Sequence, residues 1–223
     1  MEYKRITTIE DPLFKKLHDL MSTIFPKEEV LEYSLWKEPL EDPSIRVFVS
    51  VHEGEVVGAT EYRYYPDWNI AMTDFTIIGK PGLGIGHFLA TERMKDLKKL
   101  ANENGKELAG MFAEIYDPYK VDGSKFEGND LMNPFVRREV LSHLGYKRLD
   151  FSYVHPSWEN NGAAVSGLDL GYMPLNGEQQ SVQAALIVNF LTTYYTVLSN
   201  KPKEWIDMID HLKQQEHVTL LPL

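Results

Sequence analysis

Residues 74–90 read Asp-Phe-Thr-Ile-Ile-Gly-Lys-Pro-Gly-Leu-Gly-Ile-Gly-His-Phe-Leu-Ala, a strand-like segment that enters a glycine-rich loop and then a helix. Gly82, Gly84 and Gly86 lack Cβ atoms, so the backbone can turn sharply there and approach a ligand closely. The helix that follows offers N–H groups without intrahelical partners and the positive end of its dipole. Glycine loops also occur for packing alone, but this combination favours a site for phosphate or pyrophosphate.

Two well-known phosphate loops do not fit this stretch. A Walker loop requires Lys and then Ser or Thr after its last glycine, and His87 and Phe88 stand there instead. The dinucleotide fingerprint G-x-G-x-x-G fails because Leu89 takes the place of its third glycine. The loop therefore indicates a phosphate ligand held in some other way.

The pattern on both sides of the loop predicts a chain of alternating strands and helices. Upstream we expect a strand at 5–11, helices from Pro12 and at 27–40, a hairpin of strands at 46–52 and 56–65, and a strand at 70–78. Downstream we expect a helix to Asn104, a strand at 106–116, an irregular segment at 117–132, a helix from Asn133-Pro134 to Gly145, strands at 146–155 and 166–174, helices at 179–198 and from Pro202, and a last strand at 217–223.

The helix after the loop has an apolar side and a basic side. Ile85, Leu89, Met94, Leu97 and Ala101 fall near helical spacing, which predicts that they face the core. The basic residues of the helix are expected on its remaining, solvated surface: Arg93, Lys95, Lys98 and Lys99.

Composition excludes several classes of protein. The chain has 223 residues, 43% of them apolar, with a net charge of -10 and no cysteine. It can bury a full core, and disulfides, thiolate metal sites and a cysteine nucleophile are ruled out. The acidic balance argues against nucleic-acid binding and mildly favours cationic substrates. No run approaches the ~18 apolar residues of a membrane helix, and no secretory signal opens the chain, so we expect a cytoplasmic protein without membrane contact.

The order of strand, glycine loop, helix, strand and helix resembles the GNAT superfamily of N-acetyltransferases. The resemblance rests on the loop from Gly82 to Gly86, the helix to Asn104, the strand 106–116 and the helix that ends at Leu144-Gly145-Tyr146, and it covers about residues 45–154. It implies an α/β (α+β) fold with a mixed, mostly antiparallel sheet flanked by helices, whose middle strands, 70–78 and 108–116, splay apart. We expect a GNAT-like core at 1–158 and a helical extension at 159–223 that covers the core or joins a dimer contact.

The resemblance also implies acetyl-coenzyme A as the acyl donor, with no metal. Lys80 would supply charge beside the pyrophosphate. By position, the arm of the cofactor would be lined by Phe75, Thr76, Ile77 and Ile78, and its phosphates would face Gly82, Leu83, Gly84, Ile85, Gly86 and His87.

Two positions depart from the family pattern. Pro81 stands where Arg or Gln is usual, and it offers neither a side-chain donor nor an N–H. Leu141 stands where a Tyr often protonates the departing thiolate. Another group, or water, must take that role.

The implied reaction is attack of a primary amine on the thioester. Three carboxylates on the central strands are candidate bases, Glu61, Asp74 and Glu114, and Tyr116 is a candidate acid; each is also a typical residue of a solvated or packed strand. The acceptor would be a small-molecule or peptide amine, its choice shaped by residues 117–132, and a homodimer is one option for assembly. The alternative is a GNAT-like domain that binds a coenzyme A thioester or another ligand without catalysis.

Overall fold

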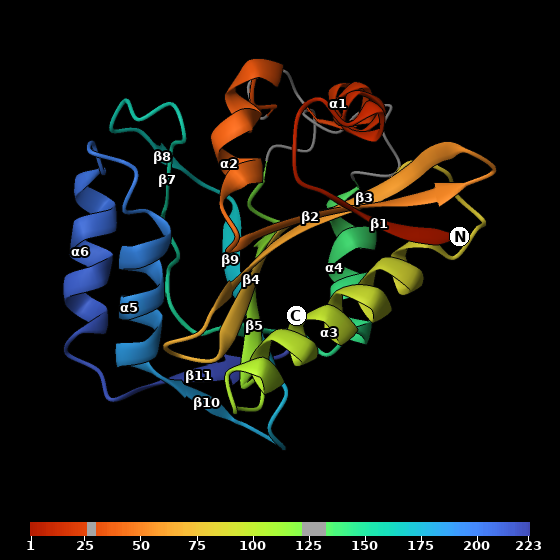
Figure 1. The fold of residues 1–223 in the computed structure, drawn as a ribbon. Coiled ribbons are helices and arrows are strands. Elements are labelled where there is room, and N and C mark those ends of the chain that lie inside the picture. Colours follow the sequence, from red (N-terminus) through yellow and green to blue (C-terminus); the bar gives the residue numbers. More distant parts are fainter. Residues whose placement is uncertain (26–29, 122–132) are drawn as a thin grey trace. The chain divides into compact units, whose positions relative to one another are not determined.

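The computed structural model contains both strands and helices and describes residues 1–25, 30–121 and 133–223 (Figure 1). The described residues form two compact units, Met1–Met111 and Phe112–Leu223. The elements of the first unit are β1 (Glu2–Ile6), α1 (Pro12–Ile24), η2 (Tyr33–Trp36), α2 (Lys37–Glu41), β2 (Ile45–His52), β3 (Glu55–Tyr65), β4 (Ile70–Ile78) and α3 (Ile85–Glu103). Strand β5 (Gly110–Tyr116) begins at the end of this unit and lies mostly in the second.

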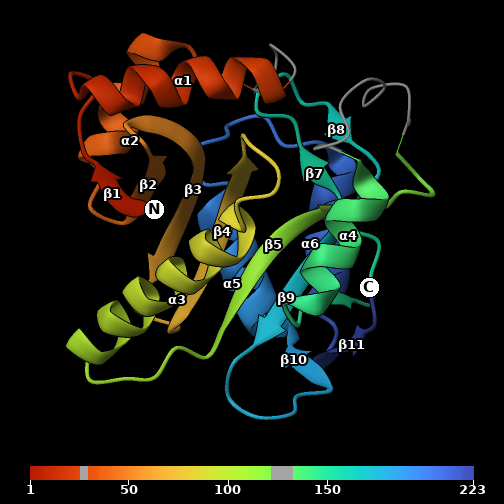
Figure 2. The ribbon, with the colours of Figure 1, turned by 90° about the vertical axis from the view of Figure 1, so that its right-hand side faces the viewer.

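The first unit is built on an antiparallel sheet in the order β1-β2-β3-β4. Helices α1 and α2 cover one face of this sheet and α3 covers the other, as Figure 2 shows. Helix α1 begins where the sequence predicts it, because the Asp11 side chain accepts from the Leu13 N–H and Pro12 occupies the first turn. The face of α1 toward the sheet is apolar and buried, through Phe14, Leu17, Met21 and Ile24.

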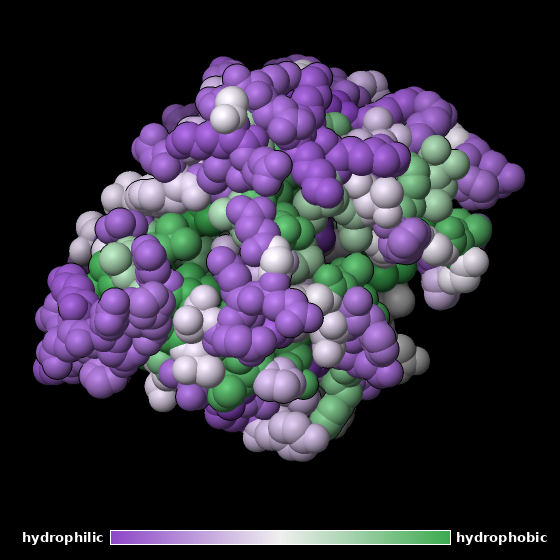
Figure 3. All heavy atoms as spheres, turned by 90° about the horizontal axis from the view of Figure 1, so that it is seen from below, coloured by the Kyte–Doolittle hydropathy of each residue, from purple (hydrophilic) through white to green (hydrophobic). Residues whose placement is uncertain are grey.

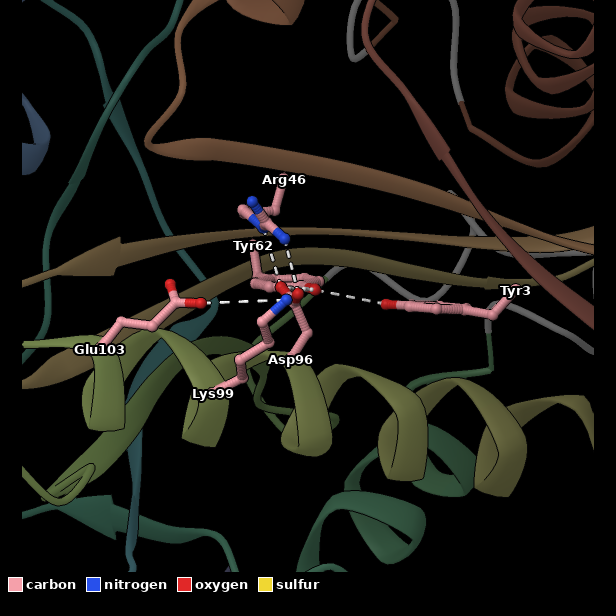
Figure 4. A network of polar contacts seen from close by, with 6 residues as sticks. All are labelled: Tyr3, Arg46, Tyr62, Asp96, Lys99 and Glu103. Carbon is pink, nitrogen blue, oxygen red and sulfur yellow. Dashed lines mark hydrogen bonds and ion pairs between the residues drawn. The ribbon is translucent and has the colours of Figure 1, made fainter.

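Helix α3 is fixed to the sheet by both apolar and polar contacts. Its buried stripe is Ile85, Leu89, Arg93, Leu97 and Ala101. Near the middle of the helix, Asp96 accepts two hydrogen bonds from Arg46 of β2, at 2.8 and 2.5 Å, and one from the Tyr62 hydroxyl of β3, at 2.6 Å (Figure 4). The Tyr62 hydroxyl in turn lies 3.4 Å from that of Tyr3 in β1. This network therefore connects three strands of the sheet with one helix.

The second unit contains strands in the order β5-β9-β6-β11-β10. Its further elements are α4 (Pro134–His143), β6 (Lys147–Leu149), β7 (His155–Pro156), β8 (Ala164–Val165), β9 (Leu168–Pro174), β10 (Ser181–Gln183), α5 (Ala184–Tyr194), α6 (Lys203–Leu212) and β11 (His217–Leu221). Helix α5 packs on β5 through Phe190, which stacks on Phe112 at 4.3 Å, and Phe112 also contacts Tyr172 of β9 at 4.8 Å.

Helices α5 and α6 lie side by side in this unit (Figure 1). Trp205, Met208, Ile209 and Leu212 of α6 are buried, whereas its outer side, at the left of Figure 3, is hydrophilic. None of the helices in the described residues is both long and apolar enough to cross a membrane.

Several element boundaries differ from the sequence prediction, for reasons of pairing. The first strand lies earlier, at Glu2–Ile6, because it pairs with β2 over its whole length. The predicted strand 146–155 is interrupted after Leu149, where the Asp150 N–H bonds to the Thr219 carbonyl at 2.9 Å. The predicted helix 179–198 is shortened because residues 181–183 pair with β11 before α5 starts. The predicted helix 27–40 corresponds to η2 and α2, and residues 27–29 lie outside the described residues.

Candidate functional site

The glycine loop has the geometry that an anion site at a helix start requires. Gly82 and Gly84 adopt φ values of 84° and 67°, the left-handed region that L residues rarely occupy. Gly84 is the N-cap of α3, and no side chain caps this helix. A Cβ at Gly82 or Gly84 would meet no atom within 4 Å, so the space beside the loop is open. The first-turn amides of α3 are thus available to an anion from solvent, and Lys80, which precedes the loop in the sequence, is exposed.

The start of α3 is held firmly against the sheet behind this loop. Ile85 and Leu89 form a buried cluster with Val57, and Ile78 and Leu83 pack against it. Gly58 of β3 permits the close approach of α3 to the strand, because a Cβ at position 58 would stand 2.5 Å from Ile85 Cγ2. An anion at the loop would therefore meet a helix end whose position is fixed by packing.

Strand β4 carries an irregularity where the sequence predicts the cofactor arm. Tyr62 pairs with Thr73 and Glu61 pairs with Phe75, so Asp74 is the extra residue of a β-bulge. Beyond it, Phe75 contacts the Phe25 ring beyond α1 and Thr76 bonds to Arg93 of α3, so neighbouring residues face opposite sides of the sheet. The side chains of Phe75, Thr76, Ile77 and Ile78 cannot all line one side of a ligand, and their predicted contact with the cofactor stays a prediction.

Two of the predicted carboxylates influence each other at this bulge. Burial of the half-buried Glu61 raises the pKa of its carboxyl well above the ordinary value, the charge of Asp74 raises it further, and Arg63 opposes both. Asp74 itself is exposed. A carboxyl group whose pKa is raised in this way keeps its proton at a higher pH than an ordinary glutamate does.

Glu114 has different surroundings, all within the second unit. The hydroxyls of Tyr153 and Tyr195 both donate to Glu114 Oε1 and lie 2.6 Å from each other, and His155 Nε2 lies 3.5 Å from Glu114 Oε2. Burial alone would raise the pKa of Glu114, but the charge of His155 and the hydrogen bonds from His155, Tyr153 and Tyr195 lower it below the ordinary value. Glu114 is therefore a carboxylate with occupied oxygens, and Tyr116 lies half-buried two residues further along β5.

Solved structures with the same arrangement of elements are GNAT-family acetyltransferases. A protein from Bacteroides thetaiotaomicron, described as a candidate acetyltransferase of the GNAT family, matches with a TM-score of 0.60 and 13% identity over 90% of this chain and 98% of its own. Aminoglycoside 6'-N-acetyltransferase complexed with coenzyme A matches with a TM-score of 0.55 and 15% identity over 80% of this chain and 99% of its own. The chain has the GNAT fold.

The likeness to GNAT proteins is one of structure. Aminoglycoside 6'-acetyltransferase type Ii also matches, with a TM-score of 0.52 and 16% identity over 80% of this chain and 100% of its own. No protein-family model matches the chain, and no curated protein matches it in sequence. The resemblance predicted from the sequence, and with it the fold class, is confirmed at the level of the fold. The splay of strands 70–78 and 108–116 and the division at residue 158 stay predictions.

On this GNAT fold, the predicted site residues fall into two groups. The predicted cofactor residues, with Glu61 and Asp74, lie in the first unit, whereas Glu114 and Tyr116 lie in the second. His87 is exposed in the first turn of α3. Of the predicted acceptor loop, residues 117–121 are described, and 122–132 lie outside the described residues. The described residues contain no cluster of three or more metal-ligating side chains.

The sequence prediction for Arg93 is wrong, and the partners of Glu114 were missed. Arg93 is 3% exposed and faces the sheet rather than solvent. A signal was present, because Arg93 stands four residues after Leu89 and four before Leu97, both of which were predicted to face the core. No comparable signal linked Tyr153, His155 and Tyr195 to Glu114, because these residues come together only through the tertiary fold.

Proposed function

We propose that this protein is a coenzyme A-dependent N-acyltransferase, which moves an acetyl group from acetyl-coenzyme A to a primary amine by direct attack. The observation that carries the proposal is the open glycine loop, with Gly84 in the left-handed region as the uncapped start of α3. A diphosphate fits this feature because it combines negative charge with several acceptor oxygens. The fold shared with a coenzyme A-bound aminoglycoside acetyltransferase supports the same ligand.

The chain would hold the donor mainly through its backbone. Amides between Gly82 and His87 would bind the pyrophosphate, and Lys80 would offset the loss of a side-chain donor at Pro81. Residues 75–78 of β4 would contact the arm, which brings an acyl group activated as a thioester. Alignment of the two reactants can lower the barrier by about 7–11 kcal/mol, so a site of this kind relies chiefly on positioning.

The acceptor must lose a proton before it attacks. An amine with a pKa of about 10.4 needs roughly 4–5 kcal/mol to reach its neutral form near pH 7. Glu61, whose pKa is raised by burial and by Asp74, suits this proton better than Glu114, whose pKa is lowered and whose oxygens bind two tyrosines. We therefore place the general base at the Glu61–Asp74 pair.

Calorimetric titration with coenzyme A tests the site, and the chain provides a matched control. Gly84→Glu should weaken binding more than about tenfold, because it adds a side chain and a negative charge at the helix start. Gly105→Glu is the control, since Gly105 has nearly the same φ, 66°, and equally open surroundings but lies beyond the other end of α3. Equal affinities in the two variants would refute the diphosphate site.

Release of coenzyme A thiol from acetyl-coenzyme A, measured with a panel of primary amines, tests the reaction. Amine-dependent release is expected from the wild-type protein. Binding of coenzyme A without release would instead support the alternative of a binding domain, which Leu141 keeps open because it replaces the usual acid. Absence of both would remove the coenzyme A assignment.

A further inference from the structure

Arg93 is a buried cation whose neighbours are hydroxyls. Its side chain points from α3 into the β3–β4 sheet, where Nη1 donates to Thr60 Oγ1 at 2.9 Å, Thr73 Oγ1 at 3.1 Å and Thr76 Oγ1 at 2.7 Å. The ion pairs of the described residues do not include Arg93, and its Nε makes no hydrogen bond to any of them. Within the part of the chain that the structure describes, this buried positive charge therefore forms no ion pair with a carboxylate.

Stability alone does not account for this arrangement. Burying a charge is unfavourable unless it is paired and fully hydrogen-bonded, and here one nitrogen stays unsatisfied. Buried ionic groups can often be replaced by apolar residues of similar volume with no loss of stability. Methionine at position 93 and valine at the three threonines would fill the same space. The retained polar cluster therefore suggests a task that an apolar core cannot perform.

The spacing of the threonines shows what the guanidinium holds. Thr73 and Thr76 are three residues apart, and residues at such a spacing lie on opposite faces of a regular strand. Both nevertheless bond to Arg93, because the bulge at Asp74 shifts the alternation by one residue between them. Arg93 thus contacts β4 on both sides of the bulge, and Thr60 gives it a third contact on the neighbouring strand. As long as Asp74 is in the chain, only the bulged form of β4 presents the hydroxyls of Thr73 and Thr76 on the same face of the strand.

We propose that Arg93 is a positioning residue, which fixes the bulge of β4 and thereby the backbone at residues 74–78. The inference rests on the proposed function, in which this segment contacts the arm of the cofactor and Asp74 acts on the proton of the amine. A bulge held by charge-assisted hydrogen bonds is stiffer than one held by packing, because such bonds are directional and stronger than neutral ones. Arg93 acts through β4 and does not touch the reacting atoms.

The decisive variant replaces the whole polar cluster by apolar residues: Arg93→Met with Thr60→Val, Thr73→Val and Thr76→Val. We expect this protein to fold, to keep coenzyme A affinity within about threefold, and to lose at least about tenfold in kcat, since small misplacements of reactants are costly. Amide hydrogen exchange at residues 73–76 should accelerate by a similar factor, while β2 stays unchanged. The single variant Arg93→Lys, which keeps a cationic donor and all three threonines, should retain a higher kcat than the apolar variant.

The control is Thr91→Val, the same substitution on α3 at a residue outside the cluster, and it should leave kcat and exchange at wild-type values. Wild-type kcat or wild-type exchange in the apolar variant would overturn the proposal. If that variant does not fold, Thr76→Val alone is judged by the same two measurements. If the wild-type protein neither binds coenzyme A nor transfers acetyl, the proposed function fails, and exchange at residues 73–76 then decides the role of Arg93 by itself.

Discussion

Glu61 and Glu114 are both screened from water on strands, yet their pKa values move in opposite directions. Burial favours the protonated form of each. At Glu61 the nearby charge of Asp74 adds to that effect, whereas at Glu114 the His155 charge and two tyrosine hydroxyls outweigh it. One residue type therefore has a raised pKa in one place and a lowered pKa in the other, because the neighbours differ.

The coupling at the bulge predicts the effect of Asp74→Asn. Removal of the Asp74 charge should lower the pKa of Glu61, because a neighbouring anion no longer opposes its ionisation. Titration of the Glu61 carboxyl carbon by NMR measures this shift directly. Asp67→Asn, which removes an exposed carboxylate at the β3–β4 turn, is the control. An unchanged Glu61 pKa in Asp74→Asn would show that the two groups do not interact.

The Glu114 cluster predicts how stability depends on pH. The charge of Glu114 raises the pKa of His155 despite its burial, so the stabilisation from this group is complete below the ordinary value of 6.5 and is lost as pH rises through the raised pKa. The contribution of Glu114, whose pKa is lowered, is present above its ordinary value of 4.5 and is lost as pH falls through the lowered one. The stabilisation that the Glu114–His155 cluster provides should therefore be greatest between the two ordinary values, pH 4.5 and pH 6.5.

Urea unfolding at several pH values tests this. Within that pH range, Glu114→Gln should lower the free energy of unfolding by about 3–5 kcal/mol, because it leaves a buried histidinium without its partner. His155→Gln should remove the alkaline part of the pH dependence, whereas His143→Gln, at an exposed histidine of α4, should not. A pH profile of His155→Gln that matches the wild-type profile would contradict the assignment.

Among the elements, α3 connects the candidate site to the sheet, since the glycine loop lies at its start and Arg93 and Asp96 lie further along. The Asp96 network should contribute strongly to the stability of the first unit. The carboxylate of Asp96, whose side chain is 16% exposed, accepts hydrogen bonds from both Arg46 and Tyr62. The Lys99–Glu103 pair on the same helix, also drawn in Figure 4, spans 3.8 Å and is solvent-exposed. Exposed ion pairs of this kind contribute little to the free energy of unfolding.

These two carboxylates give a matched pair of substitutions. Asp96→Asn should lower the free energy of unfolding by about 3–5 kcal/mol, since it leaves the mostly buried Arg46 without a counter-charge. Glu103→Gln should change it by less than about 0.5 kcal/mol. Chemical denaturation of both variants at neutral pH provides the comparison. Similar losses in the two proteins would mean that the network does not anchor α3.

Elements with local signals were predicted well, and those set by distant partners were not. Asn133 caps α4 as expected, accepting from the Phe135 N–H at 3.0 Å, with Pro134 in the first turn. Such caps need only neighbouring residues. The pairing of residues 181–183 depends on β11, far along the chain, so no local pattern could predict it. The bulge at Asp74 likewise depends on the partner strand.

For the whole chain, the acidic balance has a kinetic consequence. A net charge of -10 attracts cations at long range, and salt screens this attraction over about 8 Å at 0.15 M. We therefore expect kcat/KM for a polyamine acceptor to fall as salt is added, and to fall more than for a monoamine. Steady-state rates at several ionic strengths measure this. Equal salt dependence for both acceptors would show that the field of the protein does not steer the acceptor.

The length of β4 also permits an experiment on shape alone. Residues 58–65 of β3 pair with residues 70–78 of β4, so the paired segment of β4 contains one residue more than that of β3. A chain that lacked Asp74 would match its partner one for one and would still turn Thr73 and Thr76 toward the helix, now as alternate residues. Deletion of Asp74 would straighten β4, while each remaining side chain of the strand would still face the same side of the sheet. The variant therefore separates the effect of the strand's curvature on activity from the effect of its side chains.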